Sequence, residues 1–226
     1  SNPNATPEAH LGLEFNGVIR GSASVGAAGN ASYIIPIEVP PGTNGMTPSL
    51  SLNFHSGIRN GLVGKGWFVQ GTTSKIVRCQ QTIAQDTQNK ASDLNSDDKF
   101  CMDGHRLLVA SGTYGANNAE YRTESDEFSR IISHGTTTGD PDYFTVETKS
   151  GLTMTYGETA DSHLEAVDET ERVSWHLNKV EDTVGNYYTI SYTRETTIDT
   201  DEKSYIRPDR IDYTGNSSQS LSPRSE

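Results

Sequence analysis

The chain has 226 residues, of which 32% are hydrophobic and 21% are charged, and its formal net charge is −12. No stretch approaches the ~20 apolar residues that span a bilayer, so we predict no direct membrane insertion. The negative charge argues against nucleic acid as a partner, because binding to phosphates requires a basic surface. Enough aromatic and β-branched residues remain to build a folded core.

The N-terminal part of the chain predicts a lead-in followed by strands. Residues 1–30 are rich in Gly, Ala, Ser and Asn and are expected to be a flexible lead-in. Residues 33–39 predict a strand in which Pro36 favours an edge or a bulge, since proline cannot donate a ladder hydrogen bond. Residues 49–55 alternate apolar and polar side chains, which is typical of a strand with one buried face. Another strand is predicted over residues 73–79.

The rest of the chain continues the pattern of short strands. Residues 85–98 are acidic and predict a loop, and Asp103-Gly104 predicts a tight hairpin within residues 100–109. Residues 161–172 alone have a composition compatible with a helix, and residues 216–226 are expected to form a disordered tail. Further strands are predicted at 121–123, 129–133, 143–148, 153–156, 173–182, 187–192 and 207–213.

Regular spacing of short strands and turns predicts an all-β fold. We expect many short antiparallel strands that form a sandwich or a curved open sheet, with few or no helices. The folded domain is predicted over residues 31–215.

An acidic segment contains a candidate metal site. Asp93, Asn95 and Asp97 place oxygen atoms at alternate positions, as a calcium loop requires. The glycine and the glutamate of such a loop are replaced here by Asp98 and Gly104. A solvated acidic loop is therefore favoured over a metal site.

Nothing in the sequence assembles a catalytic constellation. Cys79 and Cys101 are too few for a disulfide scaffold or a structural zinc site, and they form either a disulfide or two half-buried thiols. The chain has no Gly-x-Ser-x-Gly elbow, no P-loop and no dinucleotide fingerprint. We therefore predict no catalytic residue, no metal and no cofactor. The histidines are scattered without metal-ligand spacing: His10, His55, His105, His134, His163 and His176.

The tryptophans are candidates for the core. Glycines surround Trp67, so we expect a tight corner that leads into a strand, and Trp175 lies within another predicted strand. Both indole rings are expected to fill a core between sheets. The alternative is a sugar-stacking surface that they would form with Tyr187, Tyr188 and Tyr192.

Several blocks of residues, in order along the chain, resemble a known family. Together they resemble the N-terminal region shared by the Salmonella plasmid virulence protein B and the B components of insecticidal toxin complexes, relatives of the Rhs/YD-repeat proteins. The resemblance covers roughly residues 30–215. The blocks are 33–50, 61–67, 78–79, 98–107, 120–124, 149–152 and 210–215.

This resemblance implies a role in a larger secreted bacterial toxin. In toxin-complex B components the region looks like part of a β-sheet shell, so the implied partners are other domains or subunits of the assembly. The resemblance thus favours a non-catalytic structural module. Two alternatives remain: a carbohydrate- or receptor-binding β domain, or a fragment of an ADP-ribosylating toxin whose enzyme domain is absent.

Overall fold

The computed structural model describes residues 21–58, 63–82, 90–95, 97–124, 129–166, 169–197 and 203–224. Their regular structure is strand, apart from a short 3-10 turn at Thr43–Gly45, so the prediction of an all-β fold is confirmed. Within these ranges, no helix has the length and apolar character needed to cross a membrane. The chain forms two compact units: Ser1–Ile37 with Ser51–Phe68, and Glu38–Leu50 with Val69–Glu226.

The first unit is built on a four-stranded sheet. Its strands are β1 (Ser22–Val25), β2 (Ala31–Ile37), β3 (Leu50–His55) and β4 (Trp67–Gln70), in that order across the sheet. The last two residues of β4, Val69 and Gln70, and the first residue of β3, Leu50, already belong to the second unit. Because β1 pairs only with residues 31–34 of β2, Pro36 lies beyond the end of that ladder and breaks none of its hydrogen bonds.

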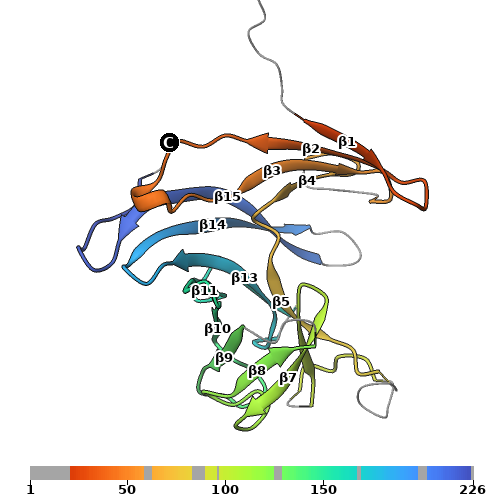
Figure 1. Ribbon diagram of the computed structural model, residues 1–226. Coiled ribbons are helices and arrows are strands. Elements are labelled where there is room, and N and C mark those ends of the chain that lie inside the picture. The colour runs from red at the N-terminus through yellow and green to blue at the C-terminus, as the bar shows by residue number, and fades with distance from the viewer. Residues whose placement is uncertain are drawn as a thin grey trace, which may run out of the picture. The chain divides into compact units, whose positions relative to one another are not determined.

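The second unit contains a closed barrel rather than the expected sandwich or open sheet (Figure 1). Closure depends on β13, whose first half pairs with β5 and whose second half pairs with β11. A strand this long can therefore close the ring against two different neighbours. The barrel strands are β5 (Lys75–Cys79), β6 (Lys99–Met102), β7 (His105–Ser111), β8 (Glu120–Thr123), β9 (Arg130–His134), β10 (Tyr143–Glu147), β11 (Thr153–Tyr156) and β13 (Arg172–Glu181).

Aromatic side chains fill the barrel. Trp175 is fully buried, and its ring meets Phe100 and Phe144 edge-on at centroid distances of 5.5 and 5.1 Å. Its indole nitrogen donates a hydrogen bond to the carbonyl of Pro141, 2.9 Å away. Gly157 has a φ of +79°, and a Cβ at this position would collide with the Trp175 ring. The barrel core thus combines tight aromatic packing with a satisfied indole donor.

Three strands extend beyond the ring. β12 (His163–Glu165) pairs with the start of β13, and β14 (Asn186–Thr197) and β15 (Lys203–Asn216) form a long antiparallel pair beside its end. The sequence composition allowed a helix over residues 161–172, and this prediction is wrong for residues 163–165, which form β12. Pairing with an adjacent strand outweighs a weak helical composition there.

Both expected ends of the domain differ from the structure. Residues 1–20 of the expected lead-in lie outside the described residues, but the chain already forms β1 from Ser22. At the other end, the expected tail folds back on β15 as far as Arg224. The amide of Leu221 donates to Asn216 O at 2.8 Å, and that of Arg224 donates to Tyr213 O at 2.8 Å. These backbone bonds hold a segment whose polar composition alone predicts disorder.

Candidate functional site

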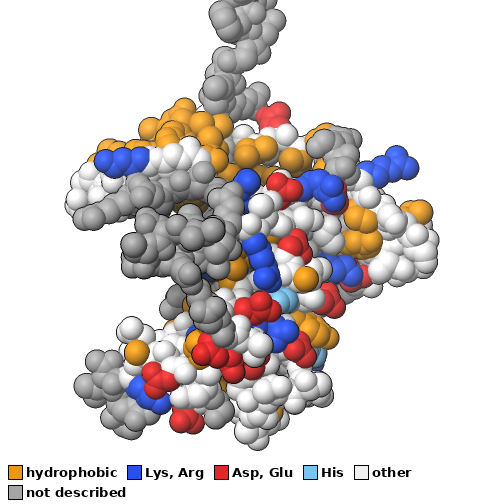
Figure 2. All heavy atoms as spheres, turned by 180° about the vertical axis from the view of Figure 1, so that it is seen from behind, with side chains coloured by type: hydrophobic (Ala, Val, Ile, Leu, Met, Phe, Trp, Pro, Cys, Tyr) orange, Lys and Arg blue, Asp and Glu red, His pale blue; other side chains and the backbone are white. Residues whose placement is uncertain are grey.

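The four-stranded sheet presents apolar side chains to solvent. No residue of β1, β2, β3 or β4 is fully buried. Val25 is 74% exposed, and Ile34 and Ile37 are each about two-fifths exposed. Because side chains alternate along a strand, the β1–β2 register puts Val25 and Ile37 on one face and Ile34 on the other. We call both faces of the four-stranded sheet β1–β4, with these three exposed residues, the apolar sheet surface, and Figure 2 shows hydrophobic side chains gathered on this sheet.

The backbone edges of this sheet are also exposed to pairing. β1 and β4 are its outermost strands, and every residue of β1 is exposed. An outer strand carries unpaired N–H and C=O groups that can pair with a strand from another chain or domain. Exposed apolar residues beside such an edge are characteristic of a contact surface.

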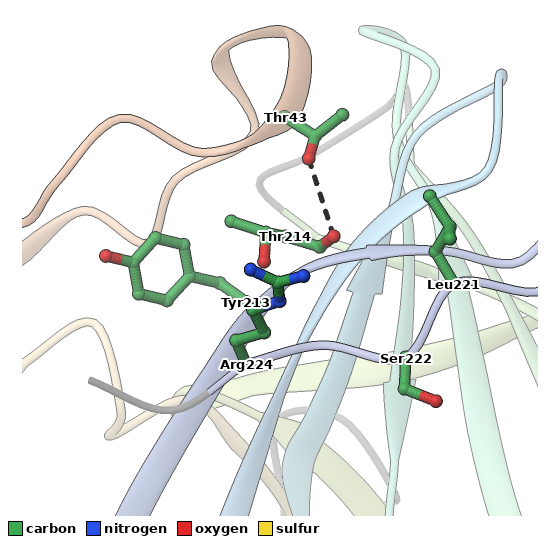
Figure 3. A pocket seen from close by; sticks show the side chains of 6 residues that line it. All are labelled: Thr43, Tyr213, Thr214, Leu221, Ser222 and Arg224. Atoms are coloured by element: carbon green, nitrogen blue, oxygen red, sulfur yellow. Dashed lines mark hydrogen bonds between the residues drawn. The ribbon is translucent and has the colours of Figure 1, made fainter.

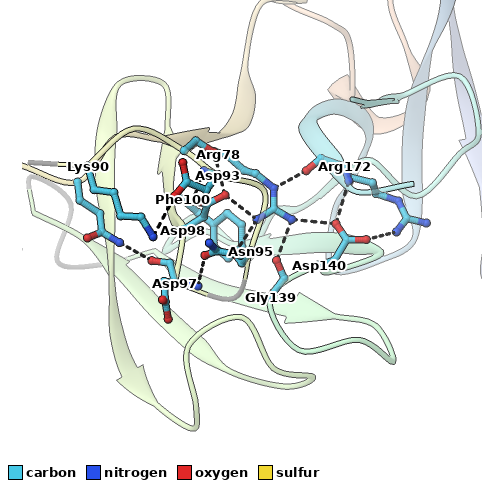
Figure 4. A network of polar contacts seen from close by, with 12 residues as sticks. Arg78, Lys90, Asp93, Asn95, Asp97, Asp98, Phe100, Gly139, Asp140 and Arg172 are labelled. Carbon is cyan, nitrogen blue, oxygen red and sulfur yellow. Dashed lines mark hydrogen bonds and ion pairs between the residues drawn. The ribbon is translucent and has the colours of Figure 1, made fainter. Parts of the chain in front are cut away.

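A second feature is a buried arginine in the barrel (Figure 4). The side chain of Arg78 is 2% exposed, and its guanidinium lies 5.7 Å from the Phe100 ring centre and 5.9 Å from that of Trp175. Its five N–H groups have five hydrogen bonds. The acceptors are Arg172 O (2.6 Å), Gly139 O (2.8 Å), Asp140 Oδ1 (3.0 Å), Asp98 Oδ2 (3.3 Å) and Asn95 O (3.4 Å).

The carboxylates around Arg78 are satisfied in turn. Asp98 also accepts from Ser92 Oγ at 2.8 Å and from the amide of Asp93 at 3.0 Å. Asp140 accepts from the amide of Arg172 at 2.9 Å and pairs with its guanidinium at 3.3 Å. The network therefore joins loop 90–98 to the barrel and leaves its central charges compensated.

This network explains what the acidic segment does. Asp93 pairs with Lys90 at 3.1 Å, and Asn95 Oδ1 accepts the amide of Asp97 at 2.9 Å. Asn95 and Asp97 also turn their carbonyls to Arg78 and Gln81. Their oxygens thus serve the loop itself, and no group of three His, Cys, Asp or Glu side chains suited to a metal occurs in the part of the chain that the structure describes.

A disulfide between Cys79 and Cys101 fastens the same loop. Their Cα atoms are 5.8 Å apart, and the bridge joins β5 to β6 diagonally, since Cys79 is opposite Lys99 and Cys101 is opposite Val77. Residues 80–100 are therefore closed at the base by a covalent bond. Arg78 and Phe100, which alternate with the cysteines, point into the barrel.

The two tryptophans have different environments. Trp175 lies in the barrel core, whereas Trp67 is half-buried in the four-stranded sheet, where its ring centre is 5.2 Å from that of Phe54. The tyrosines of the sugar-stacking alternative are also engaged. Tyr192 donates to the carbonyl of Leu177 at 2.6 Å, and the ammonium of Lys179 lies 4.6 Å from the Tyr187 ring.

The histidines are placed apart. His176 is buried in β13, and its Nε2 lies 3.1 Å from the hydroxyl of Ser174. Burial, with a smaller contribution from the positive charge of Lys75, lowers the pKa of His176 to about 4. His163 bonds to the carbonyl of Gly157, and burial also lowers the pKa of His134. His55 accepts from the amide of Gly57, His105 is exposed, and His10 lies outside the described residues.

The described residues of the second unit line cavities in two places that matter here. One, of about 370 Å³, forms where the C-terminal segment folds back on β15 (Figure 3). Its lining holds one cation, Arg224, beside the hydroxyls of Thr43 and Ser222, and Thr43 donates to Thr214 O at 3.4 Å. The other, of about 430 Å³, lies at the β6–β7 turn and includes Asp103. Sequence reasoning missed both, because each combines residues that are far apart along the chain.

Comparison with known proteins identifies the family. The family model described as "Salmonella virulence plasmid 65kDa B protein" matches residues 25–222. The chain belongs to this family. The predicted resemblance is therefore confirmed. No curated protein matches the sequence.

Several solved structures share the fold of this chain. The crystal structure of TcdB2-TccC3 has a TM-score of 0.67 at 19% identity, covering 86% of this chain and 10% of that one. The structure of the Photorhabdus luminescens Tc holotoxin pore, with the mutation TccC3-D651A, has a TM-score of 0.65 at 19% identity and covers 87% of this chain and 10% of that one. The N-terminal domain of effector protein SpvB from Salmonella typhimurium strain LT2 has a TM-score of 0.63 at 20% identity. The match covers 85% of this chain and 65% of that one. The chain thus spans about a tenth of the toxin-complex chains.

Proposed function

We propose that this chain is a non-catalytic assembly module of a large secreted bacterial toxin. Its partners are other domains or subunits of that toxin. The observation that carries the proposal is the apolar sheet surface, four strands without a single fully buried residue. Burying exposed residues such as Val25 in a contact yields about 25 cal/mol for each Å² removed from water.

The barrel supports a structural role rather than chemistry. Ser174 and His176 form a serine–histidine hydrogen bond, yet both side chains are buried and the low pKa of His176 makes its imidazole a poor base at neutral pH. The buried cation Arg78 already uses all five donors within the chain. These groups stabilise the barrel and leave no reactive atom presented to a substrate.

The carbohydrate-binding alternative lacks a supporting observation. It requires a row of exposed aromatic rings, whereas Trp175 and Tyr192 are in the core and Lys179 lies over the ring of Tyr187. The ADP-ribosylating alternative concerns a different domain of a parent protein. Assays of the purified chain for NAD hydrolysis and for actin modification test it directly, and turnover by this chain would overturn the proposal.

Hydrogen–deuterium exchange tests the assembly role. Exchange is measured on the isolated chain and on the full toxin assembly that carries it. We expect amides of β1 and β4 to exchange more slowly in the assembly, because their outer edges become paired or covered. Val25→Asp with Ile37→Asp should reduce assembly, whereas Val184→Asp, at an exposed turn outside the sheet, should not. Unchanged exchange in β1–β4 would contradict the proposal.

A further inference from the structure

The cavity of about 430 Å³ has the features of a binding site. It lies where the start of β5 and the β6–β7 turn meet β11, β13 and β14, and all of its lining belongs to the second unit. One side is polar, with Ser74 and Asp103, and the other is formed by Met154, Leu177 and Tyr188. A concave site with an apolar wall and a few fixed polar groups is the usual form of a ligand pocket.

The carboxylate of Asp103 is held in a defined orientation. Asp103 has a φ of 48° and precedes Gly104, which forms the tight turn of the hairpin. Its Oδ1 accepts the amide of Lys75 at 2.9 Å, and its Oδ2 accepts the hydroxyl of Ser74 at 2.8 Å. Ser74 Oγ in turn lies 2.9 Å from the hydroxyl of the buried Tyr156. The carboxylate is thus positioned by neutral donors that leave its charge in place.

No cation among the described residues pairs with that charge. The lining of the cavity contains no lysine or arginine, and within the described ranges no cationic side chain forms an ion pair with Asp103. Asp103 is also exposed, so its remaining lone pairs are accessible to a ligand. A net charge of −12 further attracts cationic partners toward the chain.

We propose that this cavity binds a lysine or arginine side chain carried by a partner segment. The cationic head pairs with the carboxylate of Asp103, and the methylene stem packs against Met154 and Tyr188. The inference adds to the assembly role a specific contact of defined chemistry. The cavity and the apolar sheet surface lie in different units, so each proposal can fail in its own experiment without the other failing.

Titration with capped amino acids, followed by NMR of the full chain, tests this site. Nα-acetyl-lysine methylamide and its arginine counterpart should shift amides near residues 70–75, 103 and 188, with dissociation constants on the order of 1–10 mM. The norleucine counterpart, which has a similar stem but no charge, should bind at least about tenfold more weakly. Equal binding of norleucine would overturn the proposal.

Matched variants separate the pocket from net charge. Asp103→Asn keeps an acceptor for the Lys75 amide and a residue that tolerates positive φ, but it removes the charge. We expect it to weaken lysine binding about tenfold or more at an unchanged melting temperature. Asp97→Asn removes an exposed charge elsewhere and should leave binding unchanged. Equal losses of lysine affinity in both variants would refute a cation site. The same conclusion would follow if methyl glucoside, and not lysine, shifted these amides.

Discussion

Replacing Arg78 with methionine removes the centre of the buried polar network while keeping an unbranched apolar stem. In the native chain the guanidinium has five hydrogen bonds and is enclosed by Phe100 and Trp175. Its partner Asp98 has a side chain that is also 2% exposed. The substitution therefore leaves a carboxylate buried without its cation and three backbone carbonyls without their donor.

The expected cost follows from that geometry. Breaking a buried ion pair by removing one partner costs about 3–5 kcal/mol, because the remaining charge stays desolvated. A domain of this size has an unfolding free energy of roughly 5–15 kcal/mol, so Arg78→Met should remove a large part of it. The melting temperature should fall on the order of 10 °C.

Equilibrium urea unfolding, monitored through tryptophan fluorescence, measures this cost, since Trp175 lies 5.9 Å from the guanidinium carbon. Adding Asp98→Asn to Arg78→Met should recover part of the loss by removing the orphaned charge. Arg130→Met is the matched control, because Arg130 pairs with Glu120 and Glu147 on the surface and is 47% exposed. If Arg78→Met unfolds at the same urea concentration as Arg130→Met, the network does not stabilise the barrel.

Three further predictions concern the core, the pH dependence and the disulfide. Trp175→Ala should cost about 3–5 kcal/mol of unfolding free energy, because the ring is fully buried. Trp67→Ala should cost only about 1–2 kcal/mol, because Trp67 is only partly buried, and equal urea midpoints would contradict this difference. Because the pKa of His176 is lowered to about 4, the unfolded chain binds more protons between pH 6.5 and 4, so stability should fall by up to about 3 kcal/mol as the pH decreases through that window. His176→Gln should flatten this dependence in urea titrations at pH 7 and pH 4.5, and an unchanged slope would exclude His176 as its source. Replacing both Cys79 and Cys101 with serine should lower the unfolding free energy by about 3 kcal/mol, because the disulfide closes a loop over a 22-residue separation. If dithiothreitol does not change the urea midpoint of the native chain, the disulfide does not stabilise it.

Local patterns along the chain were sufficient for most strands. Alternating residues 49–55 became β3, and Asp103-Gly104 became the β6–β7 turn, with positive φ at both residues. These elements depend on side-chain period and turn chemistry, which neighbouring residues determine. β1 was missed because four small residues carry little periodicity, and β12 because its partner β13 lies further along the chain.

The candidate sites were less accessible from sequence. Arg78 and Asp140 are 62 residues apart, and no spacing rule connects a strand arginine with that aspartate. Asp93, Asn95 and Asp97 matched part of a calcium pattern, but the pattern could not reveal that a buried cation would engage the same loop. Local composition describes which atoms are available, and the fold decides which of them meet.

The amino-acid sequence by itself determined the all-β class, the positions of most strands, the family and the acidic charge, since each depends on residue types read in order. Tertiary structure alone decided that the ring closes through the two halves of β13 and that Arg78 is buried among carboxylates. It also decided that no cation in the described part of the chain pairs with the carboxylate of Asp103. The physical reason is that closure and charge compensation are set by contacts between distant segments, whose free energy depends on three-dimensional proximity.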